Sequence, residues 1–141
     1  MELPYSQKIN SLSKTESISV EIAKYLKVGN IVALEGNLGS GKTTLVKNIC
    51  MNYNIENVTS PSFSIVNEYE GLHKIYHFDF YRINKIEELY DLGIDDYLND
   101  EAIVFIEWAN LFIDILPQRF IKIILKLHEN GEREILINKV N

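Results

Sequence analysis

The stretch that decides the fold is Gly36-Asn37-Leu38-Gly39-Ser40-Gly41-Lys42-Thr43, which matches the phosphate-binding pattern G-x-x-x-x-G-K-[ST] without a mismatch. Each fixed residue type in this pattern meets a need of a bound triphosphate. Glycines let the backbone curl so that its N–H groups point at the phosphates, and they leave no side chain in the way. Lys42 supplies positive charge to the β- and γ-phosphates, and the Thr43 hydroxyl is a magnesium ligand. The stretch therefore predicts a nucleoside triphosphate site, with Lys42 in a solvent-facing loop.

The segments on both sides of this loop fit the same prediction. Residues 31–34 form a short apolar run that is typical of a buried strand, and residues 44–51 place apolar side chains at helical spacing. The N-terminus of that helix would face the phosphates, where its N–H groups and dipole favour negative charge. A Gly-rich turn without a ligand is the alternative. The residues expected to bind the nucleotide are Gly36, Leu38, Gly39, Ser40, Gly41, Lys42, Thr43 and Thr44.

Length and composition predict one domain over residues 1–141 of a soluble protein. Hydrophobic residues make up 46% of the chain and charged residues 24%, which are ordinary values. The net charge of −6 argues against a nucleic-acid surface as the main feature. The N-terminus lacks the pattern of a signal peptide, and the apolar runs are far shorter than a membrane span. A single cysteine, Cys50, excludes an internal disulfide, and we expect a cytoplasmic location.

Periodicity and turn residues predict the remaining elements. Ser13 has the spacing of a capping box and would begin a helix that stops near Gly29. Asn130-Gly131 is a strong hairpin signal. The other predicted elements are an antiparallel strand pair at 63–69 and 74–81, a helix at 84–92, a strand at 102–107, a helix at 108–116 and hairpin strands at 120–127 and 134–140. Together these elements predict a mixed parallel and antiparallel sheet in a three-layer α/β domain of the phosphate-loop NTPase class.

Two acidic residues stand where strands should end near the phosphates. Glu107 follows a buried apolar strand and resembles a Walker B element with glutamate in place of aspartate. A bare carboxylate at such a position is costly unless it is paired or binds a metal. Glu107 is therefore a candidate for binding magnesium or orienting water, and a helix cap or a surface ion pair is the alternative.

Asp79 lies in a stretch whose alternation separates two faces. Tyr76, Phe78 and Phe80 share one face, whereas His77, Asp79 and Tyr81 share the other. The polar face is either the wall of a site or a half-exposed surface on which His77 and Asp79 pair with each other.

Two further features could contribute to the site. Ser60, Pro61 and Ser62 follow the predicted helix at a place where switch loops often lie, and an ordinary turn is the alternative. Trp108 is the only tryptophan and is either a core residue or an aromatic anchor at the nucleotide or partner surface.

Taken together, these motifs resemble the TsaE family of YjeE-like phosphate-loop ATPases, over about residues 15–117. Ser62 departs from the family, which usually has threonine there, and Ala109-Asn110 stands where Pro-Glu is common. The matching motifs are Gly36-x-Leu38-Gly39-x-Gly41-Lys42-Thr43-Thr44, Ser60-Pro61-x-Phe63, His77-Phe78-Asp79-x-Tyr81-Arg82, Glu87-Glu88-Leu89, Gly93-Ile94-x-Asp96-Tyr97, Glu107-Trp108 and Leu116-Pro117.

The resemblance implies an ATPase that is needed for making threonylcarbamoyladenosine beside the anticodon of tRNA. It implies ATP and Mg²⁺ as cofactors, with Thr43 and Glu107 as metal ligands, Asp79 near the metal or water, and Trp108 in hydrolysis or coupling. The expected partners are TsaB- and TsaD-like proteins, which the ATPase resets between turnovers, with tRNA met indirectly. We expect the ATPase to be weak alone and to depend on these partners.

Three other functions share the phosphate loop. A small-molecule kinase would bring arginines to the transferred phosphoryl group, and Arg82, Arg119 and Arg133 are scattered along this chain. A GTPase would need an Asn-Lys-x-Asp motif that recognises the base. The near match Asn84-Lys85-Ile86-Glu87 is in the wrong place for it, because it precedes Glu107 in the chain. A module that senses ATP without hydrolysing it is compatible with every motif.

Overall fold

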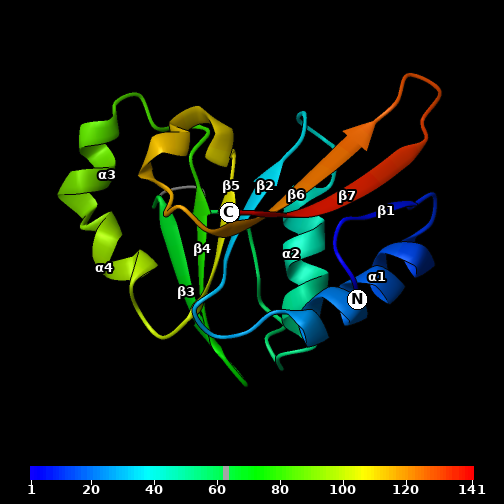
Figure 1. The fold of residues 1–141 in the computed structure, drawn as a ribbon, viewed down its shortest axis with the longest axis horizontal. Helices are drawn as coiled ribbons and strands as arrows, with labels where there is room; N and C mark the ends of the chain where they lie inside the picture. Colours follow the sequence, from blue (N-terminus) through cyan, green and yellow to red (C-terminus); the bar gives the residue numbers. More distant parts are fainter. Residues whose placement is uncertain (62–63) are drawn as a thin grey trace.

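The computed structural model describes residues 1–61 and 64–141, and these residues build one seven-stranded sheet (Figure 1). The strands are β1 (Tyr5–Lys8), β2 (Ile31–Glu35), β3 (Val66–Glu70), β4 (Lys74–Asp79), β5 (Ile103–Glu107), β6 (Phe120–Leu127) and β7 (Arg133–Val140). They lie in the order β1-β7-β6-β2-β5-β4-β3.

The centre of the sheet is parallel and its margins are antiparallel. β6, β2, β5 and β4 run parallel, while β1, β7 and β3 pair antiparallel with their neighbours. The predicted mixed sheet is therefore confirmed. Because β2, β4 and β5 are parallel, their carboxyl ends meet at one edge of the sheet, which is where ligands bind in open α/β folds.

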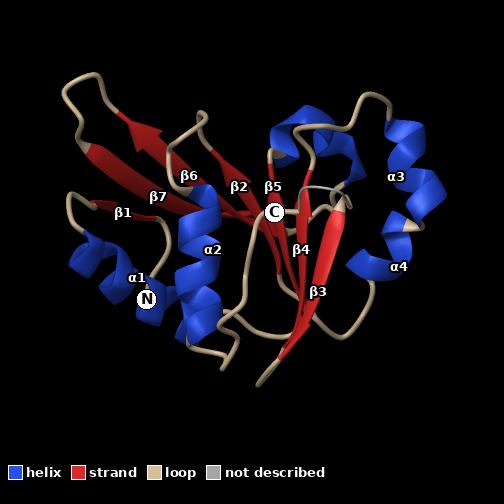
Figure 2. Cartoon of the chain, turned by 180° about the vertical axis from the view of Figure 1, so that it is seen from behind, coloured by secondary structure: helices blue, strands red, loops and turns tan. Residues whose placement is uncertain are grey.

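Helices cover both faces of the sheet, as predicted (Figure 2). On one face lie α1 (Leu12–Tyr25) and α2 (Lys42–Met51), packed on apolar side chains such as Ile75 and Phe105. On the other lie α3 (Ile86–Leu92), α4 (Ile94–Leu98) and the 3₁₀ helix η1 (Ala109–Ile115). η1 stands where the sequence predicts a regular helix at 108–116, and Phe112 breaks it with φ −138° and ψ 52°. The result is a three-layer α/β domain.

Some boundaries differ from the prediction. α1 is capped by Ser11, whose Oγ accepts a hydrogen bond from the Lys14 amide, so Ser13 lies inside the first turn. The strand predicted at 63–69 is shorter as β3, and Phe63 lies outside the described residues. The strand predicted at 74–81 ends at Asp79, and α4 directly follows α3 at Gly93.

β1 is a strand that the sequence pattern does not predict. This short strand pairs with β7 from Tyr5↔Ile137 to Lys8↔Glu134. Its burial alternates between half-buried and exposed, so no strong apolar signal marks it. Along residues 1–61 and 64–141, every helix is too short or too polar to cross a bilayer.

Candidate functional site

The Gly-rich loop connects β2 to α2 and needs glycine for two different reasons. At Gly36, an added Cβ would lie 2.5 Å from Ser40 Oγ and 2.6 Å from the Leu125 carbonyl oxygen. Gly41 occupies the N-cap position of α2 with φ +102°, which L side chains rarely adopt. β2, the loop and α2 follow one another in the order that the sequence predicts, and α2 begins at the carboxyl edge of the sheet.

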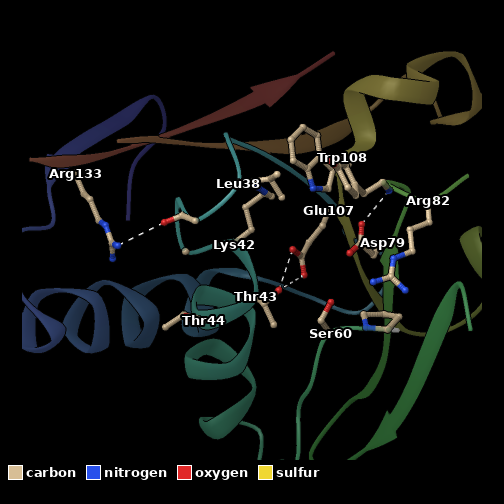
Figure 3. Close-up of a pocket in the computed structure, with 14 residues that line it drawn as sticks. Leu38, Lys42, Thr43, Thr44, Ser60, Asp79, Arg82, Glu107, Trp108 and Arg133 are labelled. Atoms are coloured by element: carbon tan, nitrogen blue, oxygen red, sulfur yellow. Dashed lines mark hydrogen bonds between the residues drawn. The ribbon is translucent and has the colours of Figure 1, made fainter. Parts of the chain in front are cut away.

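A cavity of about 470 Å³ opens at this edge, beside the carboxyl ends of β4 and β5 (Figure 3). Most of the predicted site residues line it, although Gly36 and Ser40 belong to the loop without facing the cavity. Ser62, from the predicted switch loop, lies outside the described residues. The predicted residues in the lining are Leu38, Gly39, Gly41, Lys42, Thr43, Thr44, Ser60, Pro61, Asp79, Glu107 and Trp108.

Lys42 is buried rather than solvent-facing, which corrects the expectation from the sequence. The residue is 5% exposed, and Nζ donates to the carbonyl oxygens of Gly36 at 2.6 Å and Asn37 at 3.1 Å. Burial lowers the pKa of Lys42, while the charges of Glu107 and Asp79 oppose that shift. The ammonium is thus held in the loop by carbonyl dipoles and nearby carboxylates.

Glu107 sits at the centre of a buried hydrogen-bonded group. Thr43 Oγ1 lies 3.0 Å from Glu107 Oε1 and 2.8 Å from Oε2, and His77 Nε2 lies 2.6 Å from Oε2. Glu107 is 3% exposed, so it forms no surface ion pair, and Trp108 rather than Glu107 holds the N-cap position of η1. Both alternatives for Glu107 are therefore wrong. The structure joins it instead to the phosphate-loop threonine, 64 residues away.

Asp79 faces the cavity from the end of β4, and the predicted division of faces holds. Its Oδ1 accepts a hydrogen bond from the Tyr81 amide at 3.0 Å, while His77 pairs with Glu107. The alternative that His77 and Asp79 pair is therefore wrong. Burial raises the pKa of Asp79 and the charge of Glu107 adds to this, against the Tyr81 amide, His77 and Lys42.

Trp108 is an aromatic wall of the cavity. Its ring centroid is 4.3 Å from Lys42 Nζ and 4.9 Å from the ring of Tyr81. Its φ of +59° is left-handed, which is rare for a bulky residue and is found mainly where the surrounding structure enforces it. Trp108 is half-buried: it packs against the apolar core on the face of the sheet covered by α3, α4 and η1, and it also lines the cavity.

Two of the three arginines reach the cavity, although they are far apart in the sequence. Arg82 follows β4, and Arg133 begins β7 and reaches the Gly39 carbonyl oxygen with Nη2 at 3.5 Å (Figure 3). Their wide spacing along the chain is therefore no argument against a small-molecule kinase, because the fold brings Arg82 and Arg133 to one cavity. Arg82 could have been found from its place after a strand that ends at this edge. Arg133 could not, because only the pairing of β7 with β6 brings it near the loop.

A second cavity of about 430 Å³ adjoins the first, and both share Thr44 and Arg133. Ser11 at the start of α1 and Leu127 at the end of β6 also line it. Among residues 1–61 and 64–141, no group of three or more His, Cys, Asp or Glu side chains could hold a metal ion by itself. Any divalent ion at Thr43 and Glu107 would therefore take its other ligands from a bound molecule and water.

Comparisons with known proteins agree on one family. Residues 9–135 match the family model of "Threonylcarbamoyl adenosine biosynthesis protein TsaE". Proteins named "tRNA threonylcarbamoyladenosine biosynthesis protein TsaE" are 38% identical in Bacillus subtilis, over 90% of this chain and 80% of the relative, and 35% identical in Rickettsia typhi, over 94% of each. The crystal structure of Bacillus subtilis YdiB superposes with a TM-score of 0.80 and 31% identity, covering 99% of this chain and 87% of that one. The chain therefore belongs to the TsaE family, whose members take part in tRNA threonylcarbamoyladenosine biosynthesis.

Proposed function

We propose that this protein binds ATP with Mg²⁺ in the 470 Å³ cavity and hydrolyses it in support of tRNA threonylcarbamoylation. The observation that carries the proposal is the contact of Thr43 Oγ1 with both carboxylate oxygens of Glu107, at the start of α2. This contact places a hydroxyl and a buried carboxylate together beside a helix N-terminus. The same arrangement would serve a phosphate chain and the metal ion that accompanies it.

The loop and Lys42 bind the phosphates in this proposal. The first backbone N–H groups of a helix lack partners within it, and Gly41, Lys42, Thr43 and Thr44 at the start of α2 line the cavity. Lys42 Nζ donates to the Gly36 and Asn37 carbonyl oxygens, and phosphate oxygens offer stronger, charged acceptors in their place.

Thr43 and Glu107 fit a magnesium ion. Mg²⁺ prefers hard oxygen ligands and is usually bound by one or two carboxylates together with phosphates and water, so it needs no all-protein cage. Bound there, it would neutralise charge that develops on the phosphates. A donor set of one hydroxyl and one carboxylate matches this requirement.

Asp79 and Arg82 lie across the cavity from the loop and are the groups that we assign to water and to the γ-phosphate (Figure 3). The raised pKa of Asp79 brings this carboxyl nearer to the range in which a group accepts a proton from water. Trp108 covers Lys42 on one side and would limit the access of bulk water to the phosphates. Glu107→Ala and Asp79→Ala, compared side by side, decide which carboxylate orients the water, because the larger loss of hydrolysis identifies it.

The second cavity offers room for the nucleoside. It adjoins the phosphate cavity at Thr44 and Arg133, so an extended nucleotide could occupy both. Ser11 provides a polar group and Leu127 an apolar one, which suits a base that needs both.

The partners that we propose are TsaB- and TsaD-like proteins, with tRNA reached through them. The net charge of −6 disfavours direct binding to RNA. Leu111 and Ile113 lie on η1, the helix that Trp108 caps, and are 46% and 41% exposed, so they could contact a partner protein. ATP hydrolysis would then reset the complex between turnovers.

Reconstitution tests this function. The purified protein is mixed with TsaB- and TsaD-like proteins, threonylcarbamoyl-adenylate and tRNA, and modified tRNA is counted over many turnovers. We expect turnover to require both this protein and ATP. If omitting either leaves turnover unchanged, the proposed function is wrong. If a non-hydrolysable ATP analogue sustains turnover as well as ATP does, the protein senses ATP without hydrolysing it.

A further inference from the structure

His77 is a fully buried histidine on β4, between the edge strand β3 and β5, with 0% of its surface exposed. It lies on β4 directly opposite Phe105 on β5, in the same register that pairs Asp79 with Glu107. Side chains alternate along a strand, so His77 and Glu107 share the face that α2 covers. His77 therefore approaches Glu107 from the interior of the sheet, while the cavity lies at its edge.

The contact between the two side chains fixes the position of one proton. His77 Nε2 lies 2.6 Å from Glu107 Oε2. Two lone pairs at this distance would repel each other, so one hydrogen lies between the two atoms; with Glu107 ionised, the form that binds a cation, that hydrogen is on Nε2, which donates it to the carboxylate. Oε2 then accepts from His77 as well as from Thr43, whose Oγ1 is 2.8 Å away.

The other ring nitrogen of His77 contributes no polar contact. Among the described residues, Nδ1 has no hydrogen-bond partner and is shielded from solvent. A buried polar atom without a partner costs stability, and an apolar side chain at this position would avoid that cost. Among the described residues, the Glu107 carboxylate is thus the hydrogen-bond partner of the His77 ring.

We propose that His77 is a positioning residue for Glu107. Its Nε2–H holds Oε2 from inside the sheet, so the carboxylate meets Thr43 and the cavity in one orientation. This inference rests on the proposed function, because the orientation matters for the magnesium ion that accompanies the nucleotide. Hydrogen-bond partners of metal-binding carboxylates typically change metal affinity or activity by about 10- to 100-fold when they are removed.

Two amide substitutions separate positioning from simple packing. His77→Gln places an N–H donor near the position of Nε2, whereas His77→Asn carries the same amide on a shorter stem that cannot reach Glu107. His128→Asn is the matched control, because His128 is an exposed histidine near Glu134 on the β6–β7 hairpin. Each protein is titrated calorimetrically with AMP-PNP, once with EDTA and once with excess Mg²⁺. The ratio of the two affinities measures the contribution of the metal apart from the phosphate loop.

For the wild type and His128→Asn we expect tighter binding with Mg²⁺ than with EDTA. His77→Asn should lose about tenfold or more of this metal-dependent gain. His77→Gln should keep most of it, and the affinity in EDTA should change little in either variant. A full gain in His77→Asn, equal losses in both variants, or a wild type that gains nothing from Mg²⁺ would each overturn the role of His77. If the wild type binds no nucleotide in either buffer, it is the proposed function that fails.

A measurement on the unmodified protein covers the case in which the variants do not fold. Long-range ¹H–¹⁵N NMR correlations report which ring nitrogen of a histidine carries the hydrogen. We expect a protonated Nε2 for His77 in the wild type. A hydrogen on Nδ1 with a bare Nε2 would overturn the inference, because no donor would then face Glu107.

Discussion

The two ends of β4 carry similar polar groups in opposite surroundings. At the amino end, Asp100 lies 3.2 Å from Lys74 Nζ and 2.5 Å from the Tyr76 hydroxyl, and the Lys74 and Asp100 side chains are 32% and 36% exposed. At the carboxyl end, the side chains of the His77–Glu107 pair are 0% and 4% exposed. Solvent therefore screens the first cluster, whereas the second lies in a low-dielectric environment.

The same comparison separates two aspartates. The pKa of Asp100 is lowered, first by the Tyr76 hydroxyl and then by the Glu101 amide and Lys74. The pKa of Asp79 is raised, chiefly because burial disfavours its charge. A cluster of charges is therefore not by itself the mark of a site. What distinguishes a candidate site is an ionisable group, such as Asp79, that is buried although burial of its charge costs stability.

The largest effect that we expect from this difference is on catalysis. Glu107→Gln keeps the shape of the side chain but removes the charge at the buried end. ATP hydrolysis with the partner proteins should fall by about a hundredfold or more, which is typical when a preorganised transition-state contact is lost. Nucleotide affinity measured with EDTA should stay within about tenfold, because the loop and Lys42 provide most ground-state binding of the phosphates. Turnover assays and calorimetry measure the two quantities.

Asp100→Asn is the control for that experiment, because it makes the same change from carboxylate to amide at the exposed end. It should leave hydrolysis unchanged. Hydrolysis at the wild-type rate in Glu107→Gln would show that the buried carboxylate has no part in catalysis, and the contrast between the two ends would lose its functional meaning.

A smaller effect concerns stability at the buried end. Since the pKa of Asp79 is raised by folding, the folded state holds this proton more tightly than the unfolded state does. Stability is therefore lost as pH rises from the ordinary value of 3.8 through the raised value. Asp79→Asn should raise the urea midpoint at pH 7, and the gain should disappear below pH 3.8. A lower midpoint at pH 7 would contradict the assigned cost of burial.

The smallest effect belongs to the exposed end and has the opposite sign. The pKa of Asp100 is lowered in the folded protein, so its contribution is present above the ordinary value of 3.8 and is lost as pH falls through the lowered value. Asp100→Asn should lower the urea midpoint slightly at pH 7. The difference from the wild type should shrink in high salt, which screens exposed pairs. An effect that is independent of salt would place Asp100 in the same class as Asp79.

The sequence alone predicts the fold class and most of the cavity. The phosphate loop needs a strand before it and a helix after it, and residues 31–51 contain both within one local stretch. The aromatic alternation around Asp79 assigns the faces of β4 without knowledge of the rest of the chain. Local pattern and short-range geometry are sufficient for these elements.

What the sequence could not provide depends on pairing between distant segments. The Thr43–Glu107 and His77–Glu107 contacts exist because β4, β5 and the start of α2 meet at one edge of the sheet. Arg133 reaches the loop because β7 folds back on β6. β1 forms because β7 offers it an open edge. None of these has a local signal, since spacing along the chain does not state which strands are neighbours.

The most direct test of the whole account is the affinity for ATP of the wild type and of a protein without the Lys42 charge. Lys42→Met keeps an unbranched stem against Trp108, and circular dichroism checks that the variant folds. Calorimetry with ATP and Mg²⁺ should show one binding site in the wild type. The folded variant should bind at least about a hundredfold more weakly, because the loop loses the main positive charge for the β- and γ-phosphates. Equal affinity in the two proteins would contradict this assignment, because the Gly-rich loop at residues 36–43 would then not be the nucleotide site.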